Sequence, residues 1–295
     1  MSQTAASLQR KLGTAADLHA VVRTMKAMAA SRIGQYKDAV LALDAYYRTV
    51  ELGLALCLRQ DGAALRAPST APPATASTDA IVFGTDQGMV GQFNDAIYNY
   101  AIETLEPMAG HKTLWPVGAR IAARLAGAPY ACAQSFTLPA SPQAIAALVG
   151  QILIALDARP DGGRAAQVLL LHHRPLEGGR FEPACQRLLP LDAAWAAKVA
   201  ALPWPGKALP QLAGPTPATL SAFVHEYLFV SLFRACAESQ ASENASRLVA
   251  MQRADTNIEQ LHDELLRSFH RLRQSGIDAE LFDLVAGFEA LAPSR

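Results

Sequence analysis

The chain has 295 residues, enough for one large or two ordinary domains, and 51% of them are hydrophobic. With 18% charged residues, this composition supplies a packed core and excludes global disorder. Lysine plus arginine equals aspartate plus glutamate at 26 each, which argues against a nucleic-acid binder that works through bulk positive charge. The four cysteines have no CxxC spacing and no secretory signal is visible, so we expect small buried thiols in a reducing compartment.

A long helix is expected at the start of the chain, from near Ser7 to about Leu58. Apolar residues alternate at spacings of four and three from Leu18 to Cys57. Sustained over several heptads, this period favours a left-handed coiled coil with a partner helix. The helix would be about 75 Å long.

A proline- and alanine-rich stretch at 62–78 follows and predicts an exposed linker. Next comes a short apolar strand, Asp79–Phe83, then the glycine-rich loop Gly84–Asn94 and a helix to about Ala109. Such a loop can hold phosphate at a helix N-terminus, but it has neither the GxGxxG nor the GxxxxGK[ST] spacing. We therefore favour a tight strand-to-helix turn, in which Asp86 and Asn94 cap the turn and the following helix.

The middle of the chain continues the alternation of strands and helices. Lys112–Val117 and Ala166–His173 are expected strands, and Phe181–Leu189 is the expected hairpin partner of the second. Ala119–Ala126 and Ser141–Asp157 are expected helices, the latter with serine at the cap position and proline at the first helical position. Together they predict a small α/β domain over residues 79–190.

Residues 190–217 hold six prolines and are expected to be mostly connection. From Ala218 to Leu291 the pattern is helical. We place the N-terminal coiled-coil helix at residues 1–60 and the C-terminal one at 216–292. Its apolar stripe comprises Ala254, Ile258, Leu261, Leu265, Phe269 and Leu272. The predicted fold class is α/β, with a long antiparallel coiled coil of the terminal helices and a central Rossmann-like domain. The apolar segment Leu220–Cys236 contains charged residues and predicts a buried helix rather than a membrane span.

No nucleophile elbow, HExxH motif or paired-carboxylate site is recognisable. His172 and His173 are neighbours on a strand, so they point to opposite faces and form a poor metal clamp. Glu226 and Glu243 lie inside a helix and more readily form local salt bridges. Near the C-terminus a polar cluster is either a solvated helix face or a contact for acidic loops of a partner; it comprises Arg267, Arg271, Arg273 and Gln274.

Three segments resemble the gamma subunit of F-type ATP synthases, the central-stalk rotor. The segment VVRTMKAMAASR, Val21–Arg32, is similar to the KAM-x-MVAASK signature of the family. FGTDQGMVGQFN, Phe83–Asn94, stands where the family has a loop with serine, aspartate, arginine, glycine, leucine and cysteine. ASENASRLVAM with DELLRSFHRLRQSGIDAELFDLVAGFEAL, within Ala241–Leu291, resembles the ASE-x-x-x-RM-x-AM … RQ-x-x-IT-x-E pattern with matching spacing.

Some positions depart from the family pattern. Gln87 replaces the loop arginine, Val90 replaces the loop cysteine, and Asp278 stands where threonine is usual. An alternate, sodium-type bacterial branch of the family is more similar to this chain at three places. They are the residues of Arg23–Ser31, those of Gly34–Tyr36, and the proline-rich insert. The coupling ion is selected by the membrane ring and not by this subunit.

The resemblance implies a non-catalytic rotor subunit that couples proton or sodium translocation to ATP synthesis or hydrolysis at the beta subunits. Its partners would be a hexameric ring of alpha and beta subunits, the epsilon subunit and the membrane c-ring, with neither nucleic acid nor direct membrane insertion. It would be peripheral, on the cytoplasmic face of the inner membrane, with no cofactor, metal or catalytic residue. The residues implied in partner contact are Met25, Lys26, Arg273, Gln274, Asp278, Phe282, Val285 and Phe288.

A different function class remains open on the residues alone. A free-standing α/β nucleotide-binding module could dimerise through its helical arms and use the glycine-rich loop. Nucleotide binding by the isolated chain would favour this alternative.

Overall fold

The computed structural model describes residues 4–60, 77–158, 167–208 and 210–291, with the side chains of the last five excepted. It divides into two compact units. The first unit comprises the described residues up to Met28 and from Leu248 onward, and the second comprises Ala29–Arg247. Two helices, α1 (Ala5–Gln60) and α6 (Thr216–Leu291), each contribute to both units.

Helix α1 is buried along a stripe that repeats every seven residues. Its members include Leu8, Ala15, Val22, Ala29 and Tyr36, each less than 9% exposed. This repeat is the heptad period expected for a coiled-coil seam.

Leu18, which the pattern had placed in the buried stripe, is 50% exposed, so that expectation is wrong. Among the described residues of the first unit, α6 is the single element that packs against α1, and one neighbour covers only a narrow face of a helix.

The two long helices run antiparallel within each unit. In the first unit, Lys26 of α1 pairs with Asp255 of α6, while the earlier His19 reaches the later Glu259. In the second unit, Asp44 pairs with Arg234, while the later Tyr46 reaches the earlier Glu226. Rising residue numbers in α1 therefore meet falling numbers in α6, which confirms the predicted antiparallel pairing of the chain ends.

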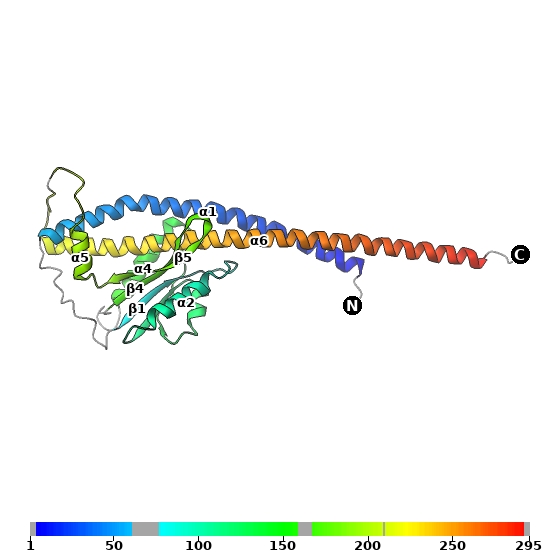
Figure 1. Ribbon diagram of the computed structural model, residues 1–295, viewed down its shortest axis with the longest axis horizontal. Coiled ribbons are helices and arrows are strands. Elements are labelled where there is room, and N and C mark those ends of the chain that lie inside the picture. Colours follow the sequence, from blue (N-terminus) through cyan, green and yellow to red (C-terminus); the bar gives the residue numbers. More distant parts are fainter. Residues whose placement is uncertain (1–3, 61–76, 159–166, 209, 292–295) are drawn as a thin grey trace. The chain divides into compact units, whose positions relative to one another are not determined.

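The second unit contains a five-stranded mixed sheet in the order β3-β2-β1-β4-β5 (Figure 1). The strands are β1 (Thr78–Phe83), β2 (Lys112–Val117), β3 (Ala131–Cys132), β4 (Gln167–Pro175) and β5 (Phe181–Leu189). β1 pairs in parallel with β2 and β4, whereas β5 returns antiparallel to β4 as the expected hairpin partner.

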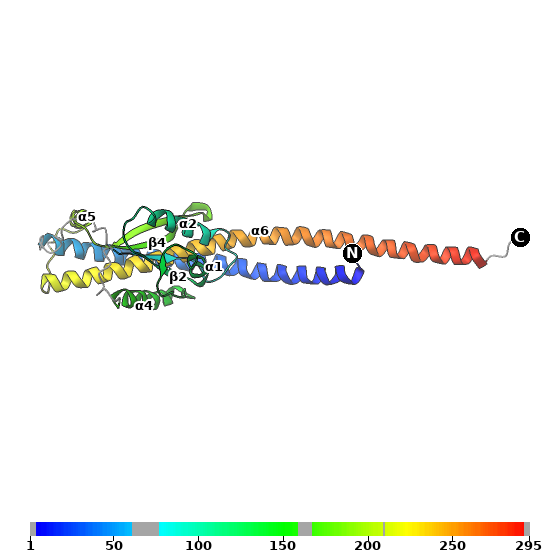
Figure 2. The same cartoon turned by 90° about the horizontal axis from the view of Figure 1, so that it is seen from below.

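Four shorter helices accompany the sheet: α2 (Phe93–Leu105), α3 (Ala119–Leu125), α4 (Ile145–Asp157) and α5 (Ala193–Ala200). Figure 2 shows α2 and α4 on opposite sides of the sheet. Alternate residues of β1 explain this arrangement, because Ala80 and Val82 pack with α2 and α3, whereas Ile81 and Phe83 pack with α4 and α6. Both faces of the sheet are thus buried, as parallel strands require.

Several expected boundaries differ from the structure. Helix α2 ends at Leu105 rather than near Ala109, because Pro107 has no amide hydrogen to continue the helix. Ser141 makes no capping hydrogen bond, and Pro142–Ala144 forms a 3-10 turn ahead of α4. Helix α5 lies inside the stretch expected to be connection.

Two other sequence predictions concern the linker and the thiols. Of the linker expected at 62–78, only the last two residues are described, and Thr78 already belongs to β1; the remainder lies outside the described residues. Cys57 and Cys236 are buried as expected, whereas Cys132 is exposed and Cys185 is partly exposed.

The segment Leu220–Cys236 is helical, as predicted, and several of its apolar side chains belong to the core clusters. By length and composition alone, α6 contains a window apolar enough to cross a membrane. Of that window, 44% is buried inside the structure. Packing in the second unit therefore explains part of the apolar character of this stretch.

Candidate functional site

The glycine-rich loop and the ASENASR stretch of α6, far apart in sequence, meet in the second unit. The Ser246 hydroxyl donates a 2.7 Å hydrogen bond to the carbonyl oxygen of Val90, which is itself buried. A Cβ on Gly91, where φ is +58°, would lie 4.0 Å from that hydroxyl. Two of the three segments that carry the family resemblance thus form one contact.

The loop is held by its own polar side chains. Asn94 accepts a hydrogen bond from the Thr85 amide at 3.1 Å and donates one to the Thr85 hydroxyl at 2.8 Å. Asp86 accepts from the amides of Ala119, at 2.7 Å, and Leu138, at 2.9 Å. Asp86 therefore caps α3 instead of the helix that follows the loop, which corrects the sequence expectation. The loop forms the tight turn that was favoured.

Two buried histidines flank this region, on opposite faces of β4 as predicted. Nε2 of His172 lies 3.0 Å from a carboxylate oxygen of Glu238 on α6. The His173 ring packs between the rings of Phe93 and Phe181, with distances between ring centroids of 4.0 and 4.7 Å. Burial lowers the pKa of His173 to about 3, with a smaller contribution from His172, so His173 is neutral at physiological pH. Neither ring is arranged to share a metal with the other.

The two glutamates assigned to local salt bridges behave differently. Glu243 lies 2.6 Å from Arg247, one helical turn later, and both side chains are buried, which confirms the prediction. Glu226 instead accepts a 2.6 Å hydrogen bond from the Tyr46 hydroxyl of α1 and makes no ion pair within the described residues. Sequence reasoning could not foresee this partner, which is 180 residues away.

Of the residues implied in partner contact, Met25 and Lys26 lie on α1 in the first unit. The Lys26 ammonium donates to Asp255 at 2.8 Å, and His19 approaches the other oxygen of that carboxylate at 3.1 Å. The hydrogen bond from Lys26 holds the pKa of Asp255 below its usual range. Sequence reasoning missed Asp255, because a single carboxylate beside an apolar stripe gives no local signal.

Arg273, Gln274 and Asp278 lie near the end of α6 in the first unit. All three are exposed, and their side chains make no hydrogen bond or ion pair with another described residue. Along the helix, Arg273 is 18 residues from Asp255, or about 27 Å at 1.5 Å per residue. The structure therefore does not bring these three residues together with Met25 and Lys26.

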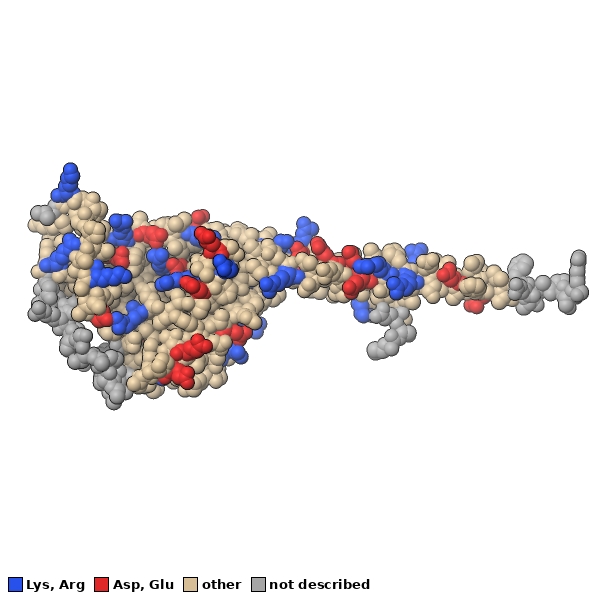
Figure 3. All heavy atoms as spheres, in the orientation of Figure 1, with Lys and Arg blue, Asp and Glu red and all other residues tan. Residues whose placement is uncertain are grey.

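The last described turns of α6 expose large apolar side chains. We call this group the apolar end: Ile277 at 56% exposure, Leu281 at 59%, Phe282 at 73%, Leu284 at 71% and Val285 at 49%. In Figure 3 the end of α6 next to the grey residues shows acidic side chains set in uncharged surface. The side chain of Phe288 lies outside the described residues. Exposed apolar residues gathered on one helix point to a surface that something outside this chain covers.

Comparison with known proteins agrees with this architecture. The family model described as ATP synthase matches residues 4–291. A curated ATP synthase gamma chain of Moorella thermoacetica is 25% identical over 291 residues, covering 96% of this chain and 98% of the relative. The gamma chain of Salinibacter ruber is 41% identical, but only over 95 residues, which is 32% of this chain and 31% of the relative.

Solved structures share the fold. A chain from the mitochondrial ATP synthase of Euglena gracilis, in a structure of the OSCP, F1 and c-ring in rotational state 3, matches with a TM-score of 0.64 at 18% identity. That match covers 97% of this chain and 94% of the other. A chain from the central stalk and c-ring of the Tetrahymena thermophila mitochondrial ATP synthase matches with a TM-score of 0.54 at 21% identity, covering 79% and 99%.

The family model spans nearly the whole described chain, and the paired terminal helices and central mixed sheet are those of central-stalk chains. The chain belongs to the ATP synthase gamma-chain family.

Proposed function

We propose that this chain is a non-catalytic rotor subunit of an ATP synthase. The observation that carries the proposal is the apolar end, which leaves Phe282 73% exposed within the part of the chain that the structure describes. Apolar contact is non-directional, so a surrounding ring of subunits can cover these side chains while the helix turns. Directional hydrogen bonds would resist the same motion.

The exposed polar residues beside the apolar end have a complementary role. Arg273, Gln274 and Asp278 offer donors and acceptors that are not used within the described chain. They would contact beta subunits and bias them between nucleotide-site conformations, because a partner shifts such an equilibrium only through differential contact. Met25 and Lys26 would contact the same ring of subunits. Lys26 would do so through the ammonium hydrogens that do not bind Asp255.

The wider assembly follows from this role. Ion flow through a membrane c-ring would turn the shaft, and the ring of alpha and beta subunits would make or hydrolyse ATP. The central domain would stand beside the epsilon subunit and the c-ring, at the cytoplasmic face of the inner membrane. Assignment to a sodium-type branch stays a prediction, as do the domain boundaries 1–60, 79–190 and 216–292.

The apolar end provides the sharpest test. Changing Phe282→Ser together with Val285→Ser removes side chains whose burial contributes about 1.5 to 3 kcal/mol each. We expect tagged double variant, expressed in the native host, to recover at least tenfold less alpha and beta subunit than the unchanged chain, by quantitative mass spectrometry. ATPase activity in the eluate should fall in proportion.

Ile154→Ser is the matched control, because Ile154 is 71% exposed but lies on α4 in the second unit. Recovery of the partners should be unchanged by it. Equal recovery with the double variant would contradict the proposed role of the apolar end. A chain that is recovered alone or as a homodimer and binds nucleotide would instead support the free-standing nucleotide-binding module.

A further inference from the structure

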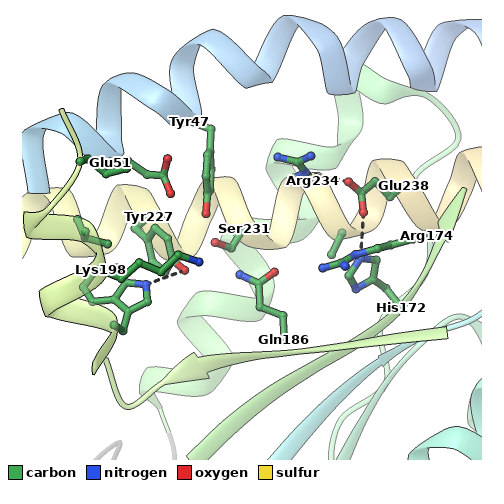
Figure 4. Close-up of a pocket in the computed structure, with 14 residues that line it drawn as sticks. Tyr47, Glu51, His172, Arg174, Gln186, Lys198, Tyr227, Ser231, Arg234 and Glu238 are labelled. Carbon is green, nitrogen blue, oxygen red and sulfur yellow. Dashed lines mark hydrogen bonds and ion pairs between the residues drawn. The ribbon is translucent and has the colours of Figure 1, made fainter. Parts of the chain in front are cut away.

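A cavity of about 520 Å³ lies in the second unit between α1, β4, β5, α5 and α6. Figure 4 shows its polar lining, with Gln186 rising from β5, Ser231 and Arg234 on α6, and Lys198 on α5. The volume falls within the range of pockets that bind small molecules. The rotor role makes no use of this cavity.

One wall holds a buried hydroxyl without a partner. Ser231 is 2% exposed, and its oxygen makes no hydrogen bond within the described structure. A buried hydroxyl without a partner is costly, and a ligand oxygen in the cavity would supply one. Ser231 lines the cavity, so such an atom could reach it.

The charges around the cavity favour an anion. Arg174 and Lys198 line it, and neither makes an ion pair with a described carboxylate. The third cation, Arg234, is already shared between Asp44 at 3.2 Å and Glu238 at 2.8 Å. One guanidinium group and one ammonium group at this cavity are therefore available to an incoming oxyanion.

Two carboxylates, those of Glu238 and Glu51, also line the cavity. Glu238 lies between His172, at 3.0 Å, and Arg234, so its charge is largely compensated. Burial raises the pKa of Glu51, and Tyr47 and nearby cations, Lys198 among them, act in the other direction.

Aromatic rings complete the other side of the cavity. Trp195 and Tyr227 pack edge to face at 5.1 Å, and Tyr47 lies 6.0 Å from Tyr227 between ring centroids. All three line the cavity. The space exceeds what an inorganic oxyanion needs, and the rings offer apolar surface to the body of a larger ligand.

We propose that this cavity binds a small molecule that carries an oxyanion, phosphate or carboxylate, on a compact apolar or aromatic body. Arg174 and Lys198 hold the oxyanion, Ser231 and Gln186 donate hydrogen bonds to it, and Tyr47 and Trp195 pack against the body. This inference does not rest on the rotor role.

Titration calorimetry of the full-length chain tests it with four probes: phenyl phosphate, benzoate, inorganic phosphate and benzyl alcohol. Phenyl phosphate or benzoate should bind at least tenfold more tightly than inorganic phosphate, because the rings contribute. The stronger of the two identifies the oxyanion. Benzyl alcohol, which has the body without the charge, should not bind.

Variants locate the binding. Arg174→Gln and Lys198→Gln should each weaken binding of the best probe about tenfold or more. Both positions are exposed, so these changes leave the core intact. Ser231→Ala should weaken it several-fold without lowering the melting temperature of the ligand-free chain. Arg180→Gln and Lys207→Gln remove exposed cations that do not line the cavity and should change nothing.

Three results would overturn the proposal. They are absence of binding of both aromatic anions at millimolar concentration, equal weakening by the control variants, and unchanged affinity in all three cavity variants. Because the cavity variants are judged by affinity in the isolated chain, failure here is distinguishable from failure of the rotor role, which is measured by partner recovery.

Discussion

At the scale of single residues, the pair Glu243 and Arg247 carries opposite charges at 5% exposure each. Their side chains lie 2.6 Å apart on α6. Burial raises the pKa of Glu243, and the guanidinium of Arg247 opposes that rise. Removing one member of such a pair leaves an uncompensated buried charge, which costs more than the pair itself contributes.

Arg247→Met should therefore destabilise the chain by about 3 to 5 kcal/mol near pH 8. In the variant the pKa of Glu243 rises further, so the folded state binds a proton more tightly than the unfolded state. Stability relative to the unchanged chain should be recovered as the pH falls towards the unfolded pKa of 4.5, and lost as the pH rises through the folded pKa. Denaturant unfolding at several pH values measures this difference.

The double variant Glu243→Gln with Arg247→Met is the control. It has no carboxyl to titrate, so its difference from the unchanged chain should vary little with pH. A single variant whose deficit is the same at pH 5 and pH 8 would show that Glu243 does not carry the effect.

At the scale of elements, α1 and α6 lie close together in the second unit at Gly53. A Cβ at this position would lie 2.3 Å from two ring carbons of Phe223. Glycine therefore leaves room here for the Phe223 ring, although it disfavours a helix interior by about 1 kcal/mol relative to alanine.

Gly53→Ala should thus lower the free energy of unfolding by about 1 to 3 kcal/mol, because the Phe223 ring must move. Gly34→Ala is the matched control on the same helix, since nothing lies within 4 Å of its added Cβ. It should stabilise the chain by about 0.5 to 1 kcal/mol. Changes of the same sign in both variants, measured by denaturant unfolding, would contradict the close contact.

The elements also show what the sequence can and cannot predict. Long periodic helices and the apolar strands β1 and β4 were predictable because their patterns extend over many residues. Helix α5 was missed, since its eight residues stand among prolines, although Asp192 accepts from the Trp195 amide as an N-cap. That aspartate followed by an apolar repeat was the available signal.

The candidate sites, too, could be predicted only where their residues are close together in the sequence. The exposed polar cluster and the apolar end are contiguous in sequence, so their residues could be named beforehand. The cavity could not, because its lining comes from five elements between Tyr47 and Glu238 that only the fold brings together.

At the scale of the whole molecule, the proposed torque contact can be separated from assembly. Arg273→Ala with Gln274→Ala removes two exposed side chains that have no partner in the described chain. Stability should therefore change by less than about 0.5 kcal/mol. We expect partner recovery near that of the unchanged chain, with reduced ATPase rate and torque in single-molecule rotation of the assembled complex.

Arg253→Ala provides the comparison, as Arg253 is also exposed on α6 but lies outside the polar cluster. ATPase rate and torque that are unchanged by the double variant would rule out a torque contact at Arg273 and Gln274.

Helix α6 runs for 76 residues from Thr216 to Leu291 without interruption, and this continuity restricts how its gene can change in length. Each residue turns an α-helix by about 100°, so inserting one codon in its middle would rotate every later side chain to a new face. An insertion of seven codons would return those side chains to within about 20° of their original direction. Among descendants of this gene, length changes within α6 should therefore survive as whole heptads, whereas substitutions can accumulate singly.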